Sequence, residues 1–317
     1  MVNRKPNVLL TVAIILMVIA AFVCLIVFLS SAGARHNETL DSGPQTTTPS
    51  DTPTDTASST DTDETEPSDT EPVVAPAYDA EKLQADLKEC LTGPDSTWQV
   101  VLIDLEDGAT FTASTHCNQN DLMVAADLTK LFVMATAYDK VNSGELTLEQ
   151  ISSLVTKMIR EDSASAANDL TKLIGGGDAK KGREEVNNFA TSIGCFNVEF
   201  NRLFGETGPQ NYITATDCAN LLLLIARGEC VSEEASNSML EVLTGTDGER
   251  IPGGVPEGTT VAHLNANITG TCCADVGIVF TESHNFVLAI ICNDPITNEG
   301  STRKCVEITK LAYEYLG

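Results

Sequence analysis

Residues 124–141 read VAADLTKLFVMATAYDKV and predict the element around which the fold is built. Four apolar side chains recur at the i, i+3, i+4, i+7 spacing of an amphipathic helix: Leu131, Met134, Ala135 and Tyr138. Apolar residues also fill most positions between them, so we expect a helix buried on nearly all sides. Asp127 stands where the pattern begins and is a favoured N-cap residue, with Lys130 three residues later on the same face. The entrance of this helix is therefore where a site is expected.

The stretch AADLTKLFVMATAYDKV (125–141) resembles the central helix of the penicillin-recognising serine hydrolases, which include class A β-lactamases and D-alanyl-D-alanine transpeptidases. Their motif there is Ser-x-x-Lys, with the serine as nucleophile. The resemblance spans residues 77–317 and is most specific in NYITATDCANLLLLIARGECVSEEASNSML (211–240), IPGGVPEGTTVAHLNANITG (251–270) and ADVGIVF (274–280). Asp127 occupies the serine position, and Lys130 alone is retained.

Periodicity along the rest of the domain predicts helices and strands in an α+β order. Helices are expected at 79–91, 146–160, 166–174, 183–193, 214–227, 232–243 and 302–316, and strands at 98–105, 110–114, 259–266, 276–280 and 286–292. Strands at both ends with helices between them imply one sheet assembled from distant parts of the chain. The resemblance implies an α/β/α sandwich, with a mixed sheet flanked by helices, an inserted all-helical lobe and a site between the two.

Two further motifs of the family are also altered. The family's Ser-x-Asn should follow Met158-Ile159, but Asp162 stands at the serine, Ala164 stands at the asparagine, and Ser163 is one residue out of register. The family's Lys-Thr-Gly should follow residues 261–263, but the three positions hold Leu264, Asn265 and Ala266. Glu199 lies near the place of the deacylating glutamate, but its surroundings do not match that motif and we assign it no role. The resemblance thus leaves a candidate cleft without a confident catalytic residue: Asp127, Lys130, Asp162, His263 and Asn265.

Before the domain, the chain divides into a short cytoplasmic N-terminus (1–7), an apolar segment (8–31) and a linker (32–76). Residues 8–30 form a segment without a charged residue that is long enough for a membrane-spanning helix, and basic residues precede this segment. We expect an uncleaved signal-anchor in the cell membrane, with the domain outside; a signal peptide cleaved near 31–34 is the alternative. The linker is acidic, rich in Thr, Ser and Pro, and is expected to be a disordered spacer.

The charge and the cysteine content of the chain limit which kinds of partner and metal site are expected. The net charge of −26 argues against nucleic acid. Ten cysteines suit an exported protein with disulfides, and an odd number beyond the apolar segment leaves at least one unpaired. Zinc is the competing interpretation, but the chain has no Cys-x-x-Cys pair and its four histidines lack ligand spacing. We therefore expect no metal and no cofactor.

Three functions remain open. The first is a catalytically inactive, membrane-tethered homologue that binds or senses a cell-envelope ligand of the muropeptide type. Loss of catalysis is expected because the residues of all three motifs, which act together, are altered at once. The second is a hydrolase of β-lactams or D-Ala-D-Ala peptides with an altered site, in which Asp127 and Asp162 act as an acid/base pair. The third is a structural or adhesive envelope protein.

Overall fold

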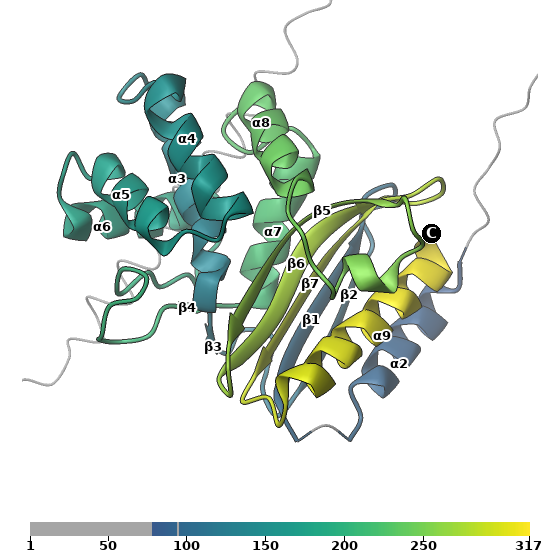
Figure 1. Ribbon diagram of the computed structural model, residues 1–317. Helices are drawn as coiled ribbons and strands as arrows, with labels where there is room; N and C mark the ends of the chain where they lie inside the picture. The colour runs from purple at the N-terminus through teal and green to yellow at the C-terminus, as the bar shows by residue number, and fades with distance from the viewer. Residues whose placement is uncertain (1–77, 94) are drawn as a thin grey trace, which may run out of the picture. The chain divides into compact units, whose positions relative to one another are not determined.

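The structure is a computed structural model and describes residues 78–93 and 95–317, which belong to one compact unit. A helix and two strands open the unit, a run of helices follows, and three strands and a long helix close it. The sheet is thus assembled from both ends of the domain, and the predicted α+β class is confirmed (Figure 1).

The main sheet has five strands in the order β2-β1-β7-β6-β5. Their bounds are β2 Thr110–Thr115, β1 Thr97–Asp104, β7 Phe286–Asn293, β6 Cys272–Phe280 and β5 Thr260–Ile268. Every pairing in this sheet is antiparallel, so the expectation of a mixed sheet was wrong. Neighbouring strands run antiparallel because short turns join β1 to β2, β5 to β6 and β6 to β7. Strand β7 also lies beside β1 in the opposite direction.

Alternation along β1 gives the sheet two buried faces. Val100 and Leu102 join the core shared with α2 (Ala80–Cys90) and α9 (Asn298–Leu316), which lie side by side on one face. Val101 and Ile103 join the core on the other face, which is shared with α7 (Ala215–Ala226) and the helical lobe. Helices on both faces make the expected sandwich (Figure 1).

The helical lobe is built around α3 (Thr129–Asn142). It also contains α4 (Leu148–Arg160), α5 (Ala164–Ile174), α6 (Ala179–Ser192) and α8 (Glu233–Thr244). All ten residues from 129 to 138 are buried, as the apolar run predicted. Helices α5 and α6 approach so closely that a Cβ at Gly182 would lie 1.9 Å from the carbonyl oxygen of Thr171, so only glycine fits there.

Four short elements had no counterpart among the predictions, because they are too short to show periodicity. They are β3 (Met123–Val124), β4 (Tyr212–Ile213) and the 3-10 turns η1 (Ala126–Leu128) and η2 (Pro252–Gly254). Strands β3 and β4 pair with each other, and the Val124 amide donates to the Asn293 side chain at the end of β7 (2.6 Å). This bond ties the start of the central helix to the sheet.

The nine cysteines in the described part of the chain are free thiols, so the disulfides that we expected are not seen there. They are spread over both cores, where most of them act as small apolar side chains. Burial raises the pKa of the Cys195 and Cys230 thiols to about 12, which makes them poor nucleophiles.

Over residues 78–93 and 95–317, no helix is long and apolar enough to cross a membrane, and no three His, Cys, Asp or Glu side chains gather as metal ligands. The predicted signal-anchor (8–31) and acidic linker (32–76) lie outside the described residues.

Candidate active-site pocket

The entrance of the central helix differs from the prediction in one respect. Asp127 lies in the 3-10 turn η1, α3 begins two residues later, and neither element has a side-chain cap. The predicted N-cap role of Asp127 was therefore wrong. Its carboxylate instead pairs with the Lys130 ammonium, with Oδ1 2.9 Å from Nζ. Ala126, just before it, has a φ of 46°, a strained backbone conformation for a residue with a side chain.

A second carboxylate meets the same ammonium group. Asp162 follows α4, and its Oδ1 accepts a hydrogen bond from Lys130 Nζ. The backbone oxygen of Asp162 lies 3.4 Å from the same nitrogen. The Lys130 side chain is 1% exposed, whereas that of Asp162 is 76% exposed. The sequence-predicted residues Asp127, Lys130 and Asp162 are thus brought together, with the amine buried between two carboxylates.

The hydroxyl of Ser163, the residue after Asp162, is engaged elsewhere. It is the N-cap of α5, and its Oγ accepts from the Ala166 amide (3.2 Å). Its backbone amide donates to the Lys157 carbonyl (3.0 Å). These bonds turn Ser163 toward its own helix, so it does not replace the missing relay serine.

The two carboxylates open onto a pocket of 460 Å³. Asp127, Asp162 and Ala164 form one wall, and the opposite wall comes from the irregular segment 202–211 together with Ile268. The Phe204 ring lies over Lys130, with its centroid 5.4 Å from Nζ. A larger hollow of 830 Å³ lies along α2 and α9, but none of the motif positions lines it.

The segment 202–211 is the part of the pocket that sequence reasoning missed. Side-chain amides hold it in place: Asn168 donates to the Phe204 carbonyl and accepts from its amide, both at 2.9 Å. Asn211 Oδ1 accepts from the amides of Asn201 and Arg202 (2.9 Å each). Amide side chains that replace a regular ladder have no periodic signal, so only the clustering of asparagines marks this segment in the sequence.

The third motif is not part of the pocket. Leu264 and Ala266 are 4% and 2% exposed and belong to the core beneath the helical lobe. His263 and Asn265, which we placed in the candidate cleft, point to the opposite face of β5 because side chains alternate along a strand. Their predicted place in the cleft was therefore wrong, because they do not lie with Asp127, Lys130 and Asp162.

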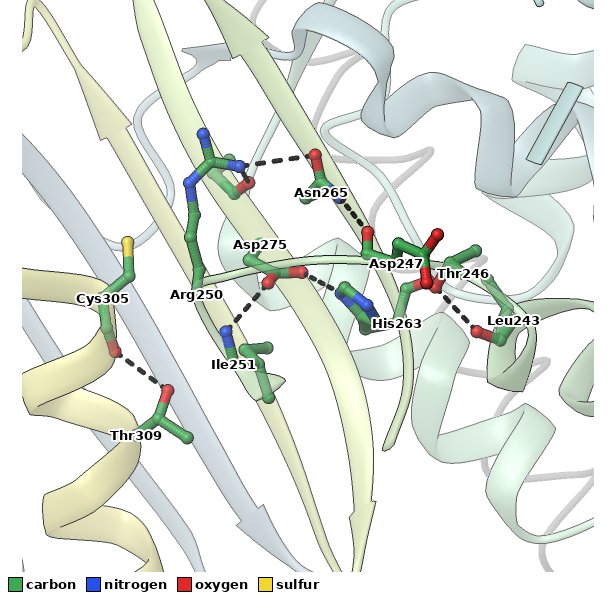
Figure 2. Close-up of polar contacts among 11 residues, drawn as sticks. Leu243, Thr246, Asp247, Arg250, Ile251, His263, Asn265, Asp275, Cys305 and Thr309 are labelled. Carbon is green, nitrogen blue, oxygen red and sulfur yellow. Dashed lines mark hydrogen bonds and ion pairs between the residues drawn. The ribbon is translucent and has the colours of Figure 1, made fainter. Parts of the chain in front are cut away.

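Figure 2 shows where His263 and Asn265 lie instead. His263 is fully buried, and its Nδ1 is 2.8 Å from Asp275 Oδ1. Asn265 donates to the Asp247 carbonyl (3.1 Å) and, with Arg250, lines a separate hollow of 320 Å³. These contacts hold β5 against β6 and the preceding loop, and we assign them a role in stabilising the fold.

A model of the beta-lactamase enzyme family matches residues 81–168 and 150–316, which together make up most of the chain. The chain belongs to this family. No curated protein sequence matches it.

Solved structures show the same fold as this β-lactamase-family chain. A β-lactamase from Sphaerobacter thermophilus is 22% identical, with a TM-score of 0.64 over 74% of this chain and 97% of its own. PBP-A, in a mutant form caught as an acyl-enzyme complex with penicillin G, is 20% identical, with a TM-score of 0.65 over 75% and 98%. A β-lactamase from Xanthomonas campestris is 16% identical, with a TM-score of 0.65 over 75% and 98%.

Proposed function

We propose that this β-lactamase-family chain is a membrane-anchored, catalytically inactive homologue whose pocket binds a cell-envelope ligand of the peptidoglycan type. The observation that carries the proposal is the position of Lys130 Nζ between Asp127 and Asp162. An ammonium group engaged by two carboxylates offers no lone pair to take a proton from a nucleophile.

Each chemical role in acyl transfer other than that of Lys130 has lost its side chain. A carboxylate at position 127 repels a developing oxyanion, whereas catalysis needs donors directed at it. Asp162 supplies a carboxylate where the family's relay is a serine hydroxyl, and Leu264 is buried and uncharged where substrate binding needs a cation. Coupled roles lost together support loss of turnover rather than one compensated change.

A binding role is supported by the pocket itself. Its 460 Å³ is within the usual range for small-ligand sites. Arg202, Gln210 and Phe204 offer charged, amide and aromatic groups along one wall, which suits a ligand with both peptide and sugar parts. The anchor is inferred from the apolar segment 8–31 and its preceding basic residues, and it places the pocket on the envelope side.

A thermal-shift titration with purified muropeptides tests the binding role, because a ligand of the native state raises the melting temperature. We expect a saturable rise for the wild-type chain. Arg202→Ala removes a side chain that lines the pocket and should abolish most of the rise in melting temperature. Arg303→Ala, on the exposed face of α9, is the matched control and should keep the rise. No shift in the wild type at millimolar muropeptide would contradict the binding role.

One observation favours a second candidate, a hydrolase with an altered site: both carboxylates line the same pocket. Turnover of a chromogenic β-lactam or a peptidyl-D-alanine ester, lost in Asp127→Asn, would establish it. We expect no turnover above buffer, because both carboxylates are engaged by one buried ammonium group.

A further inference from the structure

Lys130, Asp127 and Asp162 form a triad of one amine and two carboxylates at the junction of α3 with the α4–α5 connection. Residues 130 and 162 are far apart in sequence, yet the Lys130 nitrogen is in hydrogen-bond contact with the Asp162 carboxylate. Asp127 Oδ1 lies 2.9 Å from the same nitrogen. An amine, a carboxyl group and a second carboxylate beside the amine are the groups that amide formation requires.

We propose that Lys130 and Asp162 join in an intramolecular isopeptide bond, with Asp127 carrying the proton between them. In the reactive form, one proton has passed from the Lys130 ammonium to the Asp162 carboxylate, which leaves a neutral amine facing a carboxylic acid. Nζ attacks Cγ of Asp162, and the new Nζ–Cγ bond forms as the bond from Cγ to the hydroxyl oxygen breaks. Asp127 takes a proton from the nitrogen and returns it to the leaving hydroxyl, which departs as water. The net change is one ammonium and one carboxylate converted to one amide and one water, without any other reactant.

Positioning favours this step. Groups held in contact within one molecule react as though at very high concentration, with effective molarities on the order of 10⁵ M or more. The Asp162 backbone is held at a φ of 51°, and the flanking Ser163 is fixed as the α5 cap. Lys130 belongs to the most buried helix of the domain. Packing thus holds the Lys130 side chain in contact with Asp162.

The surroundings also favour the product. A buried ammonium group loses most of its hydration, and a neutral amide removes this cost. The Phe204 ring covers the nitrogen, while the exposed side of Asp162 faces the pocket and gives the leaving water an exit. The bond needs to form only once in the life of each molecule, so a slow reaction suffices. This step is therefore compatible with the loss of repeated turnover, and it does not depend on whether the pocket binds a ligand.

Lys140 provides a matched internal control. It too lies between two carboxylates, with Glu145 and Glu185 each 3.1 Å from its nitrogen. Its side chain is 12% exposed, and no aromatic ring within the described residues is recorded over its ammonium group. We expect this second amine to remain unmodified.

Mass spectrometry of the purified, denatured full-length chain tests the proposal. We expect the wild type to be one water lighter than its unmodified chain, and a protease digest to yield one branched peptide that joins residues 130 and 162. Lys130→Arg and Asp162→Ala should restore the missing water, because each lacks one reacting group. Asp162→Asn should lose one ammonia instead, since its amide nitrogen becomes the leaving group. Asp127→Asn should leave the chain largely unreacted, and Lys140→Arg should keep the deficit.

Circular dichroism of each variant tests whether it is folded, and only folded variants are compared, so that an absent bond is not attributed to an absent fold. A folded wild-type chain at full mass, with separate peptides containing Lys130 and Asp162, would overturn the proposal. A deficit that persists in Lys130→Arg would overturn it too, because the lost water would then come from another site.

Discussion

The entrance of α3 and strand β5 hold the altered motifs of this chain, and they have changed in opposite ways. At the α3 entrance the side chains remain polar: Asp127 and Asp162 face a pocket and hold Lys130 between them. On β5, Leu264 and Ala266 have become part of the core. One region presents charged groups to a pocket, and the other contributes apolar side chains to the core.

The difference teaches what each region requires of its sequence. Strand β5 lies at the edge of the sheet, and its inner face must be covered by the helical lobe, so apolar residues there strengthen the fold once no substrate needs them. The α3 entrance cannot become apolar while Lys130 stays, because a buried ammonium group requires a partner. A buried Lys130 therefore requires carboxylates, rather than small apolar residues, at positions 127 and 162.

The largest effect is expected from a charge on β5. Leu264→Asp places an unpaired carboxylate in the core and should lower the free energy of unfolding by about 4 kcal/mol or more. Thr260→Asp, at an exposed position of the same strand, should change it by no more than about 0.5 kcal/mol. Urea unfolding of both variants measures this contrast, and similar values would show that β5 is not the core strand described.

A smaller loss is expected at the α3 entrance. Asp162→Ala removes the isopeptide bond and with it the closure of a loop of about 30 residues, so we expect a loss of about 3–4 kcal/mol by analogy with cross-links that constrain the unfolded chain. Asp162→Asn keeps the amide and a residue that tolerates positive φ, and it should lose less than about 1 kcal/mol. Equal losses of unfolding free energy for the two variants would show that the cross-link does not stabilise this region.

The smallest effect concerns the opposite wall of the pocket. Asn168→Ala removes the two hydrogen bonds that hold Phe204 and should cost about 1–2 kcal/mol, because two backbone groups lose their partner. Amide hydrogen exchange should quicken at Phe204 and its neighbours and stay unchanged on β6. Asp169→Asn, at the adjacent exposed position, is the control and should leave exchange at Phe204 unchanged.

Much of the fold could be predicted because its signals are periodic. The apolar run of α3 predicted its burial, and strands were predicted at 98–105 and 110–114, where β1 and β2 lie and pair with each other. Strand direction could not be predicted in the same way, since apolar alternation does not say how β7 enters beside β1.

The candidate site could be predicted in part. The positions of Asp127, Lys130 and Asp162 followed from their motifs, and the structure brings them together. His263 and Asn265 were misplaced because a motif gives the order of residues but not the face of the strand on which each lies. Phe204 and its neighbours were missed because side-chain amides fix an irregular segment, and such contacts leave no periodic pattern.

Covalent labelling by a fluorescent penicillin tests the central claim most directly. We predict no label on the folded wild-type chain, whereas a variant with all three motifs restored (Asp127→Ser, Asp162→Ser, Ala164→Asn, Leu264→Lys, Asn265→Thr and Ala266→Gly) should regain labelling if it folds. A wild-type label that Lys130→Ala abolishes would contradict the account, because it would mean that the lysine between the two carboxylates still activates a nucleophile.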